Sequence, residues 1–159
     1  MNANEDVAFL RQAIELATAS VMVGGGPFGA VVVCNGEVIG RGQNSVVRDS
    51  DPSAHAEVNA IRAAARALGR PHLDDCTLYT SCEPCPMCLA TSLWARIPRI
   101  VYAATHGEAT RAGFSDTHIA MALYGDPLPA RCNRLEHMDL PEAGAPFQAW
   151  QDKADKIPY

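Results

Sequence analysis

The chain lacks the long apolar run that a membrane-spanning helix needs, and its first residues lack the charged-then-apolar pattern of a secretion signal. Internal repeats, low-complexity tracts and linkers are also absent. These absences indicate one cytoplasmic domain over residues 1–159. Because 48% of the 159 residues are apolar, the chain can bury a core without crosslinks. Its 6 cysteines are better explained as thiols or metal ligands than as disulfides.

Positive charge is scarce as well. The 13 Lys and Arg residues against 18 Asp and Glu give a net charge of −5. Proteins that bind nucleic acids usually present a basic face. Arg62, Arg66 and Arg70 lie at helical spacing, but the solvated face of an ordinary helix explains them. The charge therefore argues against a polynucleotide substrate and favours a small molecule.

Helical and strand patterns alternate along the chain. Asn35 and Gly36 predict a type I′ turn between two strands, and Asp51 followed by Pro52 predicts a helix start with Asp51 as its N-cap. The predicted helices cover residues 5–22, 51–68, 84–95, 116–123 and 146–153, and the predicted strands cover 28–34, 37–43, 77–81, 100–104 and 131–137. This alternation predicts an α/β fold, a three-layer α/β/α sandwich around a central mixed five-stranded sheet.

Two short motifs carry the chemistry. His55 and Glu57 flank one alanine, and Cys85 and Cys88 follow later at the spacing of one helical turn. One imidazole and two thiolates are zinc ligands, and three protein ligands leave the fourth tetrahedral position to water, as in catalytic zinc sites. Residues i and i+2 point about 200° apart in mid-helix, so His55 and Glu57 converge only off a helix end. Zinc lowers the pKa of its water to near neutral, and Glu57 is the predicted proton shuttle.

Cys82 is the alternative fourth ligand, which would close the site and make it structural. Its position at a strand end, before Pro84, favours the open site. The other cysteines lie in apolar strand contexts and are predicted core thiols: Cys34, Cys76 and Cys132. The other histidines lack partners at ligand spacing and are predicted surface or hydrogen-bonded residues, with His106 the nearest to the pocket mouth: His72, His106, His118 and His137.

The order H-x-E followed by P-C-x-x-C is the signature of zinc-dependent base deaminases, so the chain resembles the cytidine deaminase-like superfamily. It is more closely similar to small bacterial guanine deaminases. The segments that carry this likeness are 25–30, 42–44, 51–57, 79–88, 94–96, 113–116 and 146–150. The last two, with Gly-Phe-Ser-Asp and Pro-Phe-Gln-Ala-Trp, carry most of the weight for guanine.

The resemblance implies zinc-dependent hydrolysis of guanine to xanthine and ammonia, with one zinc ion per subunit. It implies that His55, Cys85 and Cys88 hold the metal and that Glu57 and Asp116 are catalytic. The residues that it places around the base are Asn44, Phe28, Ala56, Trp94 and Tyr159, with Phe28 and Trp94 walling the pocket. It also implies a homodimer whose C-terminal segment, about residues 143–159, packs on or exchanges with the partner subunit. Neither a nucleic acid nor a membrane is an expected partner.

The residues themselves leave alternatives open. Guanine presents N1–H and 2-amino donors, so its pocket needs acceptors, which Asp116 and Asn44 supply. Asp116 also fits a helix cap, and Asn44 also fits a turn. The same zinc site would serve a tRNA adenosine, cytidine or cytosine, or amino-triazine deaminase, although a tRNA enzyme should have a basic, aromatic C-terminal region. An interaction domain with structural zinc would need a fourth ligand and no Glu57.

Overall fold

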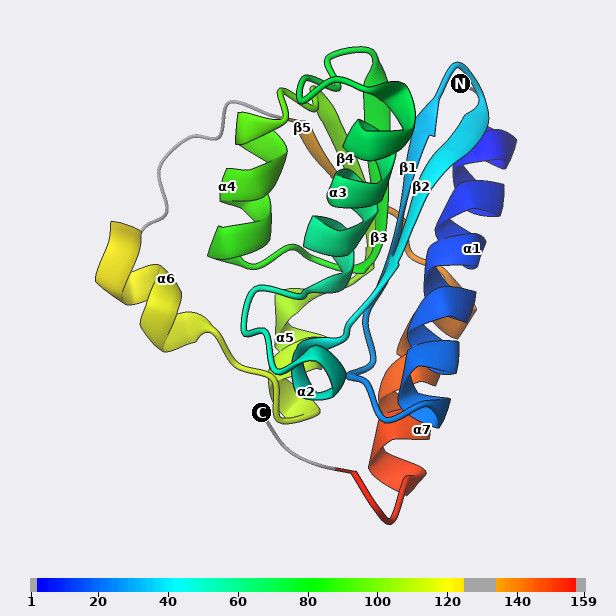
Figure 1. The fold of residues 1–159 in the computed structure, drawn as a ribbon. Helices are drawn as coiled ribbons and strands as arrows, with labels where there is room; N and C mark the ends of the chain where they lie inside the picture. The colour runs from blue at the N-terminus through cyan, green and yellow to red at the C-terminus, as the bar shows by residue number, and fades with distance from the viewer. Residues whose placement is uncertain (1–2, 125–133, 157–159) are drawn as a thin grey trace.

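The computed structural model describes residues 3–124 and 134–156, and a five-stranded sheet forms its centre (Figure 1). The strands are β1 (Gly29–Cys34), β2 (Glu37–Gln43), β3 (Cys76–Cys82), β4 (Arg99–Ala104) and β5 (Arg134–His137). They lie in the order β2-β1-β3-β4-β5. Strand β1 is antiparallel to β2 and β3, whereas β3, β4 and β5 are parallel. The predicted mixed sheet of five strands is confirmed.

Helices cover both faces of this sheet, which confirms the predicted three-layer sandwich (Figure 1). One face carries α1 (Ala3–Met22) and α7 (Ala145–Asp152), and the other carries α3 (Ala56–Leu68) and α4 (Pro86–Trp94). Strands β1 and β3 are buried along their whole length, because both of their faces are covered. Alternate residues of β1 therefore supply two separate cores, one under α1 and one under α3.

The β1–β2 hairpin turns at Asn35 and Gly36, whose φ values are 51° and 81°. Two positive φ values are typical of a type I′ turn, whose twist matches that of the flanking strands. The predicted turn is therefore confirmed. It places β2 at the edge of the sheet, under α3.

Glycines in β2 allow α3 to lie unusually close to the sheet. A Cβ atom on Gly42 would stand 2.0 Å from the carbonyl oxygen of Ala56, and one on Gly40 would stand 2.3 Å from that of Ala60. Any larger side chain at these positions would push the helix away. The contact fixes the first turn of α3, and the H-x-E motif lies on that turn.

This helix begins later than predicted. It starts at Ala56 and not at residue 51, with His55 as N-cap at φ −71° and ψ 155°. Asp51 instead closes a local turn, in which its Oδ1 accepts the N–H of Ser53 at 2.8 Å and the Ser53 hydroxyl at 2.6 Å. An Asp side chain that bonds the backbone two residues ahead serves a turn as well as a cap. A short helix, α2 (Val46–Asp49), precedes the turn.

The boundaries of other helices and strands also differ from the predicted ones. Helix α4 starts at Pro86 with Cys85 as N-cap, so Pro84 lies outside it. Helix α5 (His106–Arg111) was not predicted, whereas α6 (Thr117–Tyr124) and α7 lie within one residue of their predicted bounds; a 3-10 turn, η1 (Pro141–Gly144), precedes α7. Of the predicted strand at 131–137, residues 134–137 form β5, and residues 131–133, with Cys132, lie outside the described residues. Within residues 3–124 and 134–156, none of the helices has the length and apolar character to span a membrane.

Candidate metal centre and active site

A pocket of about 480 Å³ opens at the sheet edge where β3 and β4 end and where α3 and α4 begin. This size is ordinary for a small-molecule site. The carboxyl ends of parallel strands meet at such an edge, which is the usual place for a site in an open α/β sheet. Most of the predicted site residues line it: Phe28, Asn44, His55, Glu57, Cys85 and Asp116.

His55, Cys85 and Cys88 form a cluster whose ligand atoms all lie within 4.8 Å of one another. His55 Nδ1 lies 3.6 Å from Cys85 Sγ and 3.5 Å from Cys88 Sγ. In a tetrahedral zinc centre, bonds of about 2.0–2.1 Å to nitrogen and 2.3 Å to sulfur place those two atoms about 3.6 Å apart. The three side chains therefore have the spacing that zinc requires, and the predicted ligand set fits the metal.

Two of these ligands are N-cap residues, His55 of α3 and Cys85 of α4, and Cys88 lies in the first turn of α4. Helix N-termini carry the positive end of the helix dipole and favour thiolate over thiol. Contact with the Cys88 side chain, and then with His55, lowers the pKa of Cys85 to about 4. The same contact with Cys85, together with burial, raises the pKa of Cys88. Because metal binding deprotonates both thiols, zinc here would form a centre without formal net charge.

Glu57 lies beside this cluster and is 4% exposed. Its Oε1 accepts the Thr80 hydroxyl at 3.3 Å, and its Oε2 accepts the Cys88 thiol at 3.4 Å. Burial raises the pKa of Glu57 above its ordinary value of 4.5. A buried carboxyl group with a raised pKa in a pocket is typical of a general acid or base. The structure therefore brings the predicted proton shuttle to the predicted ligands.

Cys82 lies outside the three-residue cluster, although it lines the same pocket. Its thiol is directed at the carbonyl oxygen of Thr105, at 3.8 Å. Burial raises the pKa of Cys82 well above its usual range. This arrangement favours the open site with three protein ligands over the closed site with four.

A second cluster in the described residues contains Cys34, Asp75 and Cys76. Cys34 and Cys76 pair across β1 and β3, and both are buried in the core under α3, as predicted. Asp75 is already paired with Arg70 at 2.5 Å, and burial raises the pKa of Cys76 well above its usual range. Because the Asp75 carboxylate already pairs with Arg70, and both thiols lie in the core and away from the pocket, the His55 cluster is the better candidate for the metal centre.

Asn44 follows β2 and is 2% exposed. Its Oδ1 accepts the N–H of Val46 at 3.3 Å, and its carbonyl oxygen accepts the Ser20 hydroxyl at 3.1 Å. The turn role that the sequence left open is therefore present, and the side chain also lines the pocket. The two roles coexist because an amide oxygen has two lone pairs and the amide nitrogen has two N–H groups.

Asp116 precedes α6, and its carbonyl oxygen accepts the N–H groups of Ile119 and Ala120 at 2.9 and 3.0 Å. Its carboxylate lines the pocket. Oδ1 lies 2.8 Å from His106 Nε2, but the contact lacks hydrogen-bond geometry, and this buried oxygen has no hydrogen-bond partner among the described residues. Burial raises the pKa of Asp116. A buried acceptor without a donor is unfavourable, so this oxygen is suited to a donor on a ligand.

Aromatic rings form one wall of the pocket. Phe28 meets Phe114 edge-to-face, with ring centroids 5.1 Å apart and an interplanar angle of 88°. Trp94 does not line this pocket: it is the last residue of α4, far from the N-terminus that meets the metal site, and it is 85% exposed. Ala56 is fully buried behind the site, in the core under α3. Tyr159 lies outside the described residues.

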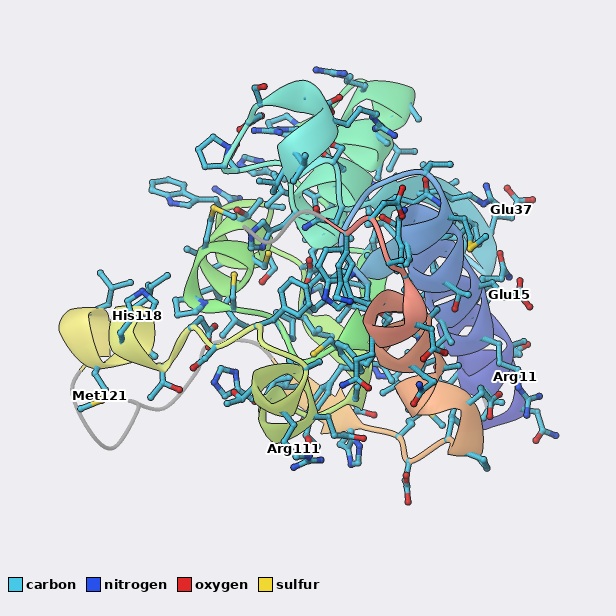
Figure 2. All side chains as sticks on the ribbon, turned by 90° about the horizontal axis from the view of Figure 1, so that it is seen from below. Arg11, Glu15, Glu37, Arg111, His118 and Met121 are labelled. Carbon is cyan, nitrogen blue, oxygen red and sulfur yellow. The ribbon has the colours of Figure 1, made fainter. Side chains whose placement is uncertain are left out.

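The sequence analysis placed His106 nearest to the pocket mouth, but it did not predict that His118 would also help to line the pocket. His106 and His118 are both pocket residues. Figure 2 shows α6, with His118 and Met121, projecting from the body of the molecule. A sequence signal for α5 existed, because Thr105 and Glu108 form a capping box directly after β4. The S/T-x-x-E pattern predicts a helix start there, and hence His106 at the same sheet edge as the metal ligands.

Comparison with known proteins identifies the family. The sequence pattern of the cytidine and deoxycytidylate deaminase zinc-binding region matches residues 3–104. The guanine deaminase of Bacillus subtilis (strain 168) is 49% identical over 152 residues, which cover 95% of this chain and 97% of that protein. Its X-ray structure matches with a TM-score of 0.72 over 100% of this chain and 99% of that chain. The structure of guanine deaminase from Nitrosomonas europaea matches with a TM-score of 0.80 at 27% identity, over 96% and 87% of the two chains.

A likeness to tRNA-specific adenosine deaminases is shorter. The enzyme of that name from Buchnera aphidicola subsp. Baizongia pistaciae is 43% identical over 103 residues, which are 65% of this chain and 64% of that protein. The likeness to the Bacillus subtilis protein, by contrast, is nearly complete. The chain therefore belongs to the zinc-binding cytidine and deoxycytidylate deaminase family, and along nearly its whole length it is similar to guanine deaminases.

Proposed function

We propose that this protein is a zinc-dependent guanine deaminase, which hydrolyses guanine to xanthine and ammonia. The observation that carries the proposal is the buried Glu57 carboxyl beside the His55, Cys85 and Cys88 cluster, in a pocket that also holds the Asp116 carboxylate. The nearly full-length likeness to a guanine deaminase supports guanine over other bases.

The chain's own residues account for the movement of protons. Zinc held by His55, Cys85 and Cys88 supplies, when bound, a water molecule that is nucleophilic at neutral pH. Glu57 accepts a proton from this water as the water oxygen bonds to C2 of guanine, and it passes the proton to the adjacent ring nitrogen. Glu57 then delivers the second proton of the water to the amine as the C2–N bond breaks. The products are xanthine and ammonia, and Glu57 returns to its starting state.

Recognition of guanine follows from the acceptors in the pocket. The base presents donors at N1–H and at its 2-amino group, and Asp116 Oδ1 is a buried acceptor without a hydrogen bond among the described residues. Asn44 adds an amide beside the pocket, and the rings of Phe28 and Phe114 provide an apolar wall for the flat base. A base that lacks these donors would leave the buried acceptors unpaired, at a cost of about 1–3 kcal/mol each.

Other substrates remain the principal alternatives. A tRNA adenosine deaminase should carry a basic C-terminal region, but this one is rich in acidic residues: Glu136, Asp139, Glu142, Asp152 and Asp155. Cytosine, cytidine and aminotriazines present an aminated ring carbon to the same zinc chemistry. A structural-zinc interaction domain would require a fourth protein ligand, and the cluster in the described residues has three.

We also propose a cytoplasmic homodimer in which residues 143–159 pack on, or exchange with, the partner subunit. Exposed apolar side chains on two helices support an interface: Leu93 and Trp94 on α4, and Ile119, Met121 and Leu123 on α6. Within one chain, α7 packs on α1 and buries Phe147 and Trp150. Phe147 and Trp150 meet the pocket residues Phe28 and Phe114, with ring centroids 6.0 and 5.2 Å apart, so a partner's α7 docked in the same way would lie beside this site.

The deciding experiment is ammonia release from the zinc-loaded protein. The substrates are guanine, adenine, cytosine, their nucleosides and an aminotriazine, and the Glu57→Gln variant serves as the control. We expect guanine to be turned over far faster than the others and the variant to be inactive. Preference for another base, or ammonia release that persists in the variant, would contradict the proposal.

A further inference from the structure

We infer that His106 is a positioning residue that holds the Asp116 carboxylate toward the bound base. This inference rests on the proposed function, because it assigns Asp116 to recognition of the base. His106 begins α5, and Asp116 precedes α6, so the pair joins two segments of the pocket wall. His106 Nε2 lies 2.8 Å from Asp116 Oδ1, and the two side chains are 36% and 18% exposed.

Asp116 needs such a partner because its surroundings disfavour a fixed carboxylate. Burial raises the pKa of Asp116, whereas the charge of His106 opposes this effect. The loop that carries Asp116 also contains Gly113, at φ 95°, and no side-chain hydrogen bond fixes Asp116 Oδ1 among the described residues. His106 is therefore the neighbour that can hold this carboxylate in the pocket. A contact that is poorly aligned without substrate commonly tightens when the substrate binds.

The His106 side chain is not needed to build the helix on which it lies. The capping box of α5 belongs to Thr105 and Glu108, with the Thr105 N–H donated to Glu108 Oε2 at 2.7 Å. His106 contributes its backbone N–H to Glu83 Oε2 at 3.1 Å, a bond that every residue except proline retains. Its ring otherwise lies 3.5 Å from the Thr117 hydroxyl. Replacing the side chain therefore removes the contact with Asp116 and leaves the helix start intact.

The consequence should appear in binding of the base more than in the chemical step. We expect His106→Ala to raise KM for guanine about 10-fold, because a hydrogen bond or contact to a charged group contributes on the order of 10-fold or more. We expect kcat to change much less, since Glu57 and the metal ligands are untouched. His106→Gln should recover most of the loss, because its amide N–H can reach the same carboxylate. His72→Ala, outside the pocket, is the matched control and should behave as the wild type.

A double-mutant cycle with Asp116→Asn tests the coupling. Guanine binding is measured as Kd in the Glu57→Gln background, so that guanine is not consumed during the measurement. Zinc content and thermal unfolding are recorded for each variant. If His106 acts through Asp116, adding His106→Ala to Asp116→Asn should change Kd by less than 2-fold, against about 10-fold alone. Equal effects in both backgrounds, an unchanged KM, or a Gln variant as weak as the Ala variant would each overturn the inference. If the wild type does not release ammonia from guanine, the proposed function fails; if it does and His106→Ala is silent, only the role of His106 fails.

Discussion

At the scale of the residue, the position of His55 explains how an H-x-E motif can place both side chains in one site. Two residues so spaced diverge within a helix. His55, as N-cap, has extended backbone angles, whereas Glu57 is the second residue of α3. Because His55 lies outside the helix, its side chain is not turned away from that of Glu57, and both side chains reach the sulfur of Cys88. The sequence predicted that the site lies off a helix end, and the structure places that end four residues later than Pro52.

Glu57 carries the prediction that belongs to this scale. Glu57→Gln preserves the shape of the side chain but cannot carry a proton, so we expect kcat to fall by about 10²–10⁴-fold. Zinc content and KM should stay close to those of the wild type, because Glu57 is not a member of the ligand cluster. Steady-state kinetics with metal analysis measures both. A variant that retains most of its kcat would remove Glu57 from the proton path.

At the scale of the element, the approach of β2 to α3 determines where His55 and Glu57 lie. The glycines of β2 let the helix backbone rest directly on the strand. Helix α4 begins at the same edge, after Pro84 and the N-cap Cys85. Periodicity and capping residues therefore predicted that α3 and α4 exist, but the residues at which these two helices begin depended on local turns. Helix α5 escaped prediction because its 6 residues are too few for hydrophobic periodicity to be seen.

Gly42→Ala tests this packing. Its new Cβ would meet the Ala56 carbonyl oxygen at 2.0 Å and the Ala60 nitrogen at 2.5 Å, both of which are backbone atoms. We expect the free energy of unfolding to fall by about 1–3 kcal/mol and zinc to bind more weakly, because the N-terminus of α3 must shift. Denaturant unfolding and zinc competition with a chelator measure the two effects. Gly144→Ala is the control, since a Cβ there meets no atom within 4 Å; equal behaviour of the two variants would contradict the packing argument.

At the scale of the whole molecule, one ion network ties the outer helix to the sheet. Arg99 of β4 donates to both oxygens of Asp6 on α1 at 2.8 Å, and to Glu136 of β5 at 2.9 and 2.8 Å. The Tyr79 hydroxyl of β3 donates to Asp6 at 2.5 Å. The hydrogen bond from Arg99 lowers the pKa of Asp6 below its ordinary value of 3.8, against the opposing effect of burial. The network thus joins three strands and α1 at the sheet end away from the pocket.

This network predicts how stability depends on pH. Because the pKa of Asp6 is lower in the folded state, its contribution is present above pH 3.8 and is lost as the pH falls through the folded pKa. Asp6→Asn should reduce the free energy of unfolding at neutral pH by about 2 kcal/mol and flatten this acid dependence. Urea unfolding at several pH values measures both. Asp155→Asn, whose exposed carboxylate pairs with Lys153, should change little; if Asp6→Asn lost no more stability than this control, the network would add none.

The C-terminal segment supplies the last prediction. Deleting residues 157–159, here called the tail, should raise KM or abolish turnover if the tail covers a pocket. Unchanged kinetics would show that the tail has no role in the site. Mixing experiments distinguish the two docking modes. If the tail covers the partner's pocket, tail-deleted chains mixed and re-equilibrated with Glu57→Gln chains should regain activity, because an intact site then receives an intact tail. A tail that covers its own pocket gives no recovery, provided that light scattering shows mixed dimers.

The sequence by itself determined the fold class and the five strands, and it predicted the cluster of His55, Cys85 and Cys88 with Glu57 beside it, because these depend on periodicity and on the spacing of chemically distinctive residues. Only the tertiary structure decided which other residues share the pocket. It separated Cys82 from the ligand cluster, left Trp94 85% exposed at the far end of α4, and brought His106 to Asp116. These outcomes depend on where each helix starts and on how separate elements meet at one sheet edge. Local sequence patterns do not encode these contacts, because they depend on the packing of elements that lie far apart in the sequence.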